Sequence, residues 1–200
     1  MDFSKEIGYL RQLNGSSMEQ KHIAVLVGSL RKQAFSRWLA LAAQKLAPSS
    51  LALEIVEISD LPFFNQDLED PEKTPPAWTA FREKMKTFDG FLFITPEYNR
   101  SVPAVLKNAV DVGSRPRGES VWSGKPAGLI SQSPGAMGGF GANHHLRQSL
   151  SAVNVAVMPQ PEAYLGGMAQ AFDDKGELVA ERTKEFLKKY LEALALWIQR

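Results

Sequence analysis

The sequence predicts an α/β fold in which a parallel β-sheet is covered by helices on both faces. Short apolar runs such as Ile23–Val27 alternate along the chain with segments whose apolar residues recur at helical spacing. The runs are mostly continuous rather than alternating, which is typical of strands buried on both faces. The chain has 200 residues, no internal repeat and no low-complexity linker, so a single domain is expected.

Composition narrows the class of protein. With 23 basic and 22 acidic residues the formal net charge is +1, which gives no electrostatic case for nucleic acid or an anionic membrane as a partner. No apolar stretch is long enough to span a bilayer, and the N-terminus lacks the apolar core of a secretory signal. The absence of cysteine excludes disulfides, thiolate nucleophiles and Cys-ligated metals, and it favours a cytoplasmic protein.

The first half of the chain divides as follows. Residues 1–20 are interpreted as an N-terminal arm before a domain at 21–200. The run Ile23–Val27 predicts the first strand, and an apolar stripe from Phe35 to Leu46 predicts a helix that ends before a proline. Leu51–Ile58 predicts the second strand. A long connection rich in proline and acidic residues follows.

The second half repeats the pattern with six further elements and a closing helix. In order, these are a helix marked by Trp78, Phe81, Met85 and Phe88, a strand at Gly90–Thr95, a helix at Pro103–Val112, a strand at Pro126–Ser131, a helix at Gly141–Leu150, a strand at Val153–Val157 and a helix at about 179–198, with Val179 on its inner face. Five strands alternating with helices predict a parallel sheet. Ligands of such sheets bind at the carboxyl ends of the strands, which directs attention to loops 28–36, 95–103 and 131–141.

The first of these loops, GSLRKQAFS, has the composition of a site for a single phosphate. Unpaired N–H groups at a helix start attract anions, Ser29 and Ser36 add hydroxyls, and Arg31 adds a forked cation. Neither GxxxxGK[ST] nor GxGxxG occurs, which disfavours a pyrophosphate. The alternative is that the serines cap the helix and Arg31 is only solvated.

The second loop begins TPEYNRSVP and is stiffened by Pro96 and Pro103. Free N–H groups at Glu97, Tyr98 and Asn99, with the Asn99 amide, could bind the edge of a planar heterocycle. The alternative is a turn that caps the following helix, with Tyr98 packed as an ordinary half-buried aromatic residue.

The third loop, SQSPGAMGGFG, contains four glycines, which let the backbone approach a flat ligand or adopt positive φ. A flexible surface turn is the alternative. No GxSxG or HExxH motif is present, and the adjacent His144 and His145 cannot easily share one metal, so neither a hydrolase nor a metal site is predicted.

Together, GSLRxxxFS, PEYNxSxPxxLKNAxDxxSRP and SGKPxxLIxxSPGxxGG resemble the NAD(P)H-dependent FMN reductase family, which includes bacterial quinone and chromate reductases. The resemblance implies a flavodoxin-like three-layer sandwich with a five-stranded parallel sheet and non-covalently bound FMN. The matching positions that would bind FMN are Ser29, Arg31 and Ser36 around the phosphate, Pro96, Glu97, Tyr98 and Asn99 along the flavin ring, and Ser133 and Gly135 on the other side of the ring or the ribityl chain.

Three departures from the family pattern are visible. Gln33 and Ala34 stand where the family often has Gly-Ser, and Ser36 stands where Asn is common. Val112 and Gly113 replace a Trp that often follows the aspartate of the third helix, which could widen the flavin pocket or alter a subunit contact.

The implied activity is hydride transfer from NADH or NADPH through FMN to quinones, flavins, azo dyes or oxidised metal oxyanions. No catalytic side chain and no metal are expected, because the flavin carries the chemistry. A flavodoxin-like electron carrier without pyridine-nucleotide turnover is the alternative, although such carriers resemble strongly acidic proteins with no arginine in the phosphate loop. A nucleotide-binding module without turnover is the third possibility, and the intact PEYN segment argues against it.

The resemblance and the sequence together predict a homodimer or homotetramer. Arg115, Arg117, His144 and Arg147 lie on or next to the two helices that border the predicted site, and arginine is favoured at interfaces. The electron acceptor, the choice between NADH and NADPH, and the role of residues 1–20 are left open by the sequence.

Overall fold

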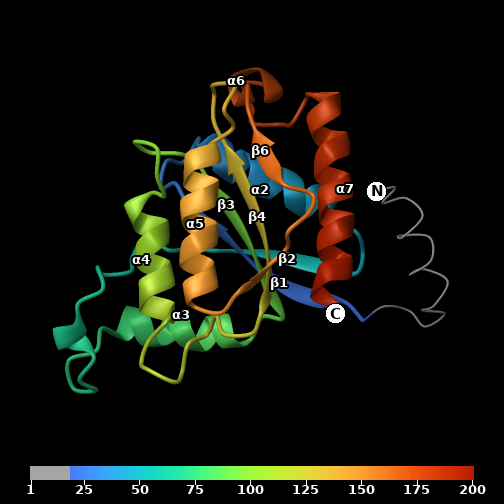
Figure 1. The fold of residues 1–200 in the computed structure, drawn as a ribbon. Helices are drawn as coiled ribbons and strands as arrows, with labels where there is room; N and C mark the ends of the chain where they lie inside the picture. Colours follow the sequence, from blue (N-terminus) through green and yellow to red (C-terminus); the bar gives the residue numbers. More distant parts are fainter. Residues whose placement is uncertain (1–18) are drawn as a thin grey trace.

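A computed structural model describes residues 19–200, so residues 1–18 of the predicted arm lie outside the described part of the chain. A twisted parallel sheet forms the middle layer, in the order β2-β1-β3-β4-β5, with β6 also pairing with β4 (Figure 1). The strands are β1 (Lys21–Val27), β2 (Leu51–Val56), β3 (Gly90–Thr95), β4 (Pro126–Gln132), β5 (Ala156–Val157) and β6 (Ala163–Leu165).

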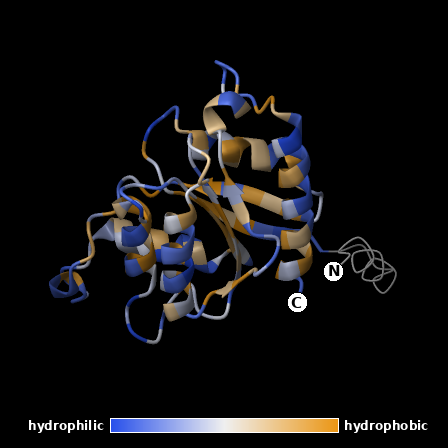
Figure 2. Ribbon diagram, turned by 45° about the horizontal axis from the view of Figure 1, so that its top comes forward, coloured by the Kyte–Doolittle hydropathy of each residue, from blue (hydrophilic) through white to orange (hydrophobic). Residues whose placement is uncertain are grey.

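Helices cover both faces of this sheet, as the alternating pattern predicts. They are α2 (Phe35–Leu46), α3 (Pro76–Lys86), α4 (Ala104–Gly113), α5 (Phe140–Ala152), α6 (Met168–Ala171) and α7 (Glu181–Ile198), with a short 3₁₀ helix η1 (Gln66–Leu68) in the long connection. Figure 2 shows the apolar strands between helices whose outer faces are hydrophilic. The flavodoxin-like three-layer architecture is therefore confirmed.

The layers follow from the alternation of side chains along the central strands. Val25 of β1 packs with α2 and α7 in one apolar cluster, whereas its neighbours Ala24 and Leu26 pack with α3, α4 and α5 in the other. Both clusters are shielded from solvent, so the sheet is a rigid base from which loops project at its carboxyl edge.

The prediction of one fifth strand at Val153–Val157 is wrong. The structure has a two-residue β5 and a separate β6, both paired with β4. The intervening segment contains Pro159 and Pro161, which have no N–H to donate to a ladder, so continuous pairing stops there. Val179 is also not on the inner face of the last helix, because it is 51% exposed and α7 begins at Glu181.

Among residues 19–200, no helix combines the length and the apolar character required to cross a bilayer.

Candidate flavin site

The loops that follow β1, β3 and β4 enclose a cavity of about 130 Å³ at the carboxyl edge of the sheet. Its lining residues are Ser29, Arg31, Ala34, Phe35, Ser36, Pro96, Glu97, Tyr98, Gln132, Ser133 and Pro134. Seven of the nine residues singled out from the sequence are thus brought together. Asn99 and Gly135 do not line the cavity, although each directly follows a segment that does.

The first loop contains polar groups that lack partners among residues 19–200. Ser36 is 0% exposed and its Oγ has no hydrogen-bond partner among residues 19–200. Arg31 is exposed and forms no ion pair in that part of the chain, and its Nη2 makes only a long contact of 3.5 Å to the Gln33 carbonyl. The alternative in which the serines cap the helix is wrong, because the N-cap is Ala34, with no side-chain cap bond. A buried hydroxyl and an unpaired guanidinium fit an anion.

The second loop is a tight two-residue turn. The Tyr98 N–H donates to the Ser101 carbonyl at 3.1 Å, and the Ser101 N–H donates back at 3.0 Å. Between them, Asn99 and Arg100 have φ of 51° and 66°, the left-handed conformation that a type I′ turn requires at both central positions. The expectation of a free N–H at Tyr98 is therefore wrong, whereas the N–H groups of Glu97 and Asn99 donate to no group in the described residues.

The Tyr98 side chain lies across the cavity. Its hydroxyl is 3.2 Å from Ser29 Oγ on the first loop, and the residue is 47% exposed. This single polar contact joins the loop after β1 to the loop after β3. Because it is a weak, part-exposed contact, a ligand with its own polar groups can displace it.

The carboxylate of Glu97 joins the second loop to the third. Glu97 Oε2 accepts a hydrogen bond of 3.1 Å from the Ala142 N–H in the first turn of α5, where the helix dipole favours a negative charge. Gly141 permits this approach, since a Cβ there would lie 2.7 Å from the Arg100 carbonyl oxygen. The sequence indicated Glu97 only as a backbone contact, so this structural role of its side chain was missed.

The third loop folds back tightly against β6. Gly138 has φ of 60°, and a Cβ there would lie 2.5 Å from the Tyr164 carbonyl carbon. Ser133 Oγ donates to the Gly135 carbonyl at 2.9 Å, which rigidifies the start of the loop. Gly138 therefore serves close packing of the loop backbone against β6, and Gly135 lies in the exposed part of the loop.

Gln132, the last residue of β4, is a site residue that sequence reasoning missed. It lines the cavity, is only 3% exposed, and its Oε1 has no hydrogen-bond partner within residues 19–200. A buried amide without partners is costly unless a ligand satisfies it. The available signal was a long polar side chain at the end of a mostly apolar strand, next to a glycine-rich loop.

The departure at Val112 and Gly113 does not affect this cavity. A Cβ on Gly113 would lie 2.6 Å from the indole of Trp122, which packs there and donates through Nε1 to the Val110 carbonyl at 2.9 Å. The space is filled from within the chain, and neither residue lines the cavity.

The two histidines take part in separate polar contacts. His144 Nε2 is 3.0 Å from the Tyr164 hydroxyl, and His145 Nδ1 is 3.0 Å from Ser101 Oγ. Burial, reinforced by Glu162, raises the pKa of Tyr164 to about 12, so this hydroxyl stays protonated at neutral pH. Within residues 19–200 no group of three or more metal-ligating side chains is present.

The sheet order and the cleft define a class of protein. A parallel sheet of order 2-1-3-4-5, with its cleft where the strand order reverses between β1 and β3, is the flavodoxin-like arrangement. Residues 22–170 match the family model described as NADPH-dependent FMN reductase. The chain belongs to this family.

Similar proteins agree with this assignment. A quinone reductase of Pseudomonas putida is 55% identical over 177 residues, covering 88% of this chain and 94% of that protein. A 2-hydroxy-1,4-benzoquinone reductase of a Burkholderia species is 42% identical over 177 residues, covering 88% and 96%. Among solved structures, the NAD(P)H:acceptor oxidoreductase FerB of Paracoccus denitrificans superposes with a TM-score of 0.83 at 39% identity, covering 90% of this chain and 97% of that one.

Proposed function

We propose that this protein is an FMN-containing oxidoreductase that passes reducing equivalents from NADH or NADPH to quinones and similar small acceptors. The observation that carries the proposal is the buried, unpartnered polar lining of the cavity, provided by Ser36 and Gln132 beside the unpaired Arg31. These groups fit the phosphate and the hydroxyl-bearing chain of FMN. The activities in the names of the related proteins favour the reductase over the electron-carrier alternative.

Each of the three loops then binds a different part of the cofactor. Ser29, Arg31 and Ser36, with the N–H groups before α2, bind the phosphate. Pro96 and the turn from Glu97 to Asn99 hold the edge of the flavin ring, mainly through backbone groups. Gln132 hydrogen-bonds the ribityl chain or the ring, and the segment from Ser133 to Gly135 lines its other side.

Bound FMN supplies the hydride chemistry, so the side chains position and stabilise it. The free N–H groups of Glu97 and Asn99 are donors for charge on the reduced ring. The Glu97 carboxylate lines the cavity, and its Oε2 already accepts a hydrogen bond from the Ala142 N–H of α5. It is therefore a positioning residue that fixes the two loops, and no acid or base is assigned.

The oligomeric state is part of the proposal. A homodimer or homotetramer is proposed, although two of the predicted interface arginines are already engaged within the chain. Arg115 Nε is 3.2 Å from Glu69 Oε1, and Arg147 Nη1 donates to the Met158 carbonyl at 3.1 Å. Arg117, with the exposed Met137 and Phe140, remains for a subunit contact. His144 is exposed as well, although its Nε2 already contacts the Tyr164 hydroxyl. A monomer mass by light scattering at micromolar concentration would overturn this part. A cytoplasmic location is likewise proposed.

The cofactor and the kinetic scheme are tested on the purified protein. Heat release and chromatography should yield one FMN per chain, whereas FAD or no flavin would overturn the proposal. Donor and acceptor share one flavin face, so steady-state rates with a nucleotide and a quinone should give parallel double-reciprocal lines. Intersecting lines, with a demonstrable ternary complex, would require separate sites.

A further inference from the structure

A second and larger cavity, of about 340 Å³, lies on the other side of the loop that follows β1. Its lining residues are Val27, Ser29, Leu30, Arg31, Lys32, Arg37, Ile55, Val56, Glu57, Ile58 and Ser59. Ser29 and Arg31 line both cavities, so the loop is a thin partition between them. The second cavity alone is lined by Lys32, Arg37 and the segment at the end of β2.

The charges around this cavity are unbalanced. Arg37 Nη2 forms an ion pair of 2.7 Å with Glu57 Oε1, which neutralises the carboxylate that Glu57 contributes to the lining. Arg31 is assigned to the FMN phosphate, whereas Lys32 is exposed and forms no ion pair among residues 19–200. A surplus of positive charge beside an open cavity favours a phosphate group.

The remaining walls suit the body of a nucleotide. Ile55, Val56 and Ile58 provide apolar lining, and Ser59 provides a hydroxyl. Apolar walls with a small number of polar groups are the usual composition of a site for a small organic ligand. The combination therefore points to an adenosine that carries a phosphate.

The distance to the flavin cavity fits the same ligand. The second cavity lies at the ends of β2 and β1, and the flavin cavity lies at the ends of β1, β3 and β4. Neighbouring strands are about 4.8 Å apart, so the two sites are separated by roughly two strand spacings, or about 10 Å. A dinucleotide whose nicotinamide lies on the flavin can bridge this separation with its adenosine end.

We propose that the second cavity binds the adenosine 2′-phosphate of NADPH, and that Lys32 makes the enzyme prefer NADPH to NADH. This rests on the proposed function, because it assumes that a pyridine nucleotide is the electron donor. NADPH and NADH differ only in that phosphate, so the ratio of their kcat/KM values isolates its contribution. Arg31 is left out of the test because it is also assigned to the FMN phosphate.

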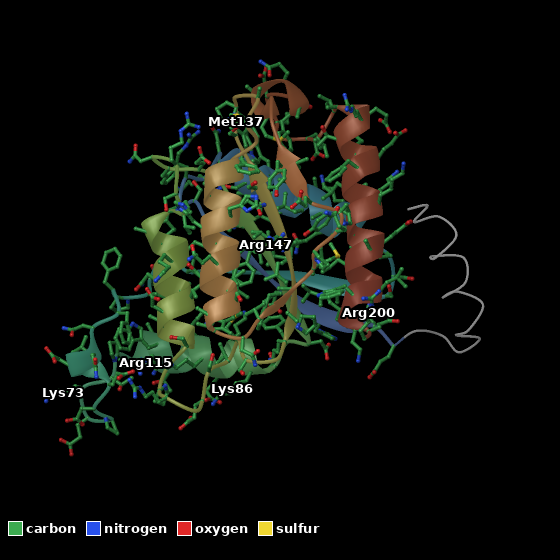
Figure 3. All side chains as sticks on the ribbon, viewed as in Figure 1. Lys73, Lys86, Arg115, Met137, Arg147 and Arg200 are labelled. Carbon is green, nitrogen blue, oxygen red and sulfur yellow. The ribbon has the colours of Figure 1, made fainter. Side chains whose placement is uncertain are left out.

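The test compares three single variants of the FMN-loaded enzyme. Lys32→Ala should lower the NADPH-to-NADH ratio of kcat/KM about tenfold, mainly through KM for NADPH, since one bond to a charged group is lost. Glu57→Gln should raise the ratio, because Arg37 is then released to the phosphate. The control is Lys73→Ala, which also removes one lysine charge and should leave the NADPH-to-NADH ratio of kcat/KM unchanged. Lys73 lies on the projecting connection between η1 and α3, far from Met137 of the third loop (Figure 3).

Binding is measured separately by competition against NADPH. Adenosine 2′,5′-bisphosphate should inhibit more strongly than 5′-AMP with the unaltered enzyme, and Lys32→Ala should abolish the difference. An unchanged kcat/KM ratio in Lys32→Ala, with turnover intact, would overturn this inference alone. Failure of both nucleotides to reduce the bound flavin would overturn the proposed function as well.

Discussion

Replacing Gln132 by leucine should stabilise the protein without FMN and weaken its binding of FMN. The amide is 3% exposed and its Oε1 has no partner within residues 19–200, so the cofactor-free fold carries the penalty of a buried, unsatisfied polar group. Such a penalty is about 1–3 kcal/mol. Leucine has a similar volume and no polar atom, so most of that penalty disappears.

The two effects have opposite signs, which makes the test sharp. A gain of about 1 kcal/mol corresponds to a rise in Tm of roughly 2–4 °C for a domain of this size. A lost hydrogen bond to the cofactor is worth roughly 0.5–1.5 kcal/mol, which is up to about tenfold in Kd. Thermal unfolding of the apo-protein measures the first effect, and fluorescence titration with FMN measures the second.

Gln44→Leu provides the matched control. Gln44 is exposed, and its Nε2 already donates to the Leu53 carbonyl at 2.8 Å, far from the cavity. That variant should lose a little stability and bind FMN normally. If Gln132→Leu instead destabilises the apo-protein and leaves FMN affinity unchanged, the amide supports the fold and does not bind the cofactor.

Three further predictions address the phosphate, the turn and the core. Arg31→Ala should weaken the binding of FMN by about one to two decades and leave the binding of riboflavin, which lacks the phosphate, unaffected in the same titration. Arg31→Lys should recover part of the lost FMN affinity. Equal losses of affinity for both ligands would place Arg31 elsewhere. Arg100→Gly should stabilise the protein by about 1 kcal/mol in urea unfolding, because a non-glycine residue in the left-handed conformation is strained. The ion pair that Arg100 forms with Glu97 contributes little to stability, since the arginine side chain is 78% exposed. A loss of stability would contradict the turn assignment. Burial raises the pKa of Tyr190, whose hydroxyl bonds the Leu129 backbone, so the native state keeps this proton while the unfolded chain loses it above about pH 10. Stability should therefore fall with rising pH above that value, by up to about 1.4 kcal/mol per pH unit, and Tyr190→Phe should flatten this slope in urea unfolding between pH 10 and 12. An unchanged slope would refute the prediction.

The regular elements could be predicted where apolar spacing alone determines them. The helix Phe35–Leu46 and the strand Gly90–Thr95 have the predicted bounds, because one has a clear apolar stripe and the other is buried on both faces. The sheet edge could not be predicted, because the apolar run at Val153–Val157 does not show that only its last two residues pair with β4. Pairing at an edge depends on neighbouring strands and on the prolines that follow.

The loops of the site could be predicted from their position and composition, but their contacts could not. Glu97 bonds Ala142, and Tyr98 contacts Ser29, across long stretches of sequence. Such partners are set by the packing of α5 and the sheet, which no local pattern encodes. The missing partner of Gln132 is likewise a property of the folded cavity.

Anaerobic reduction tests the central claim most directly. The purified yellow protein is mixed with NADPH, and separately with NADH, in the absence of oxygen while the absorbance of oxidised flavin is followed. The colour should bleach with one equivalent of nucleotide and return when one equivalent of a quinone is added. Flavin that stays oxidised in excess of both nucleotides would contradict the central claim and would favour an electron carrier.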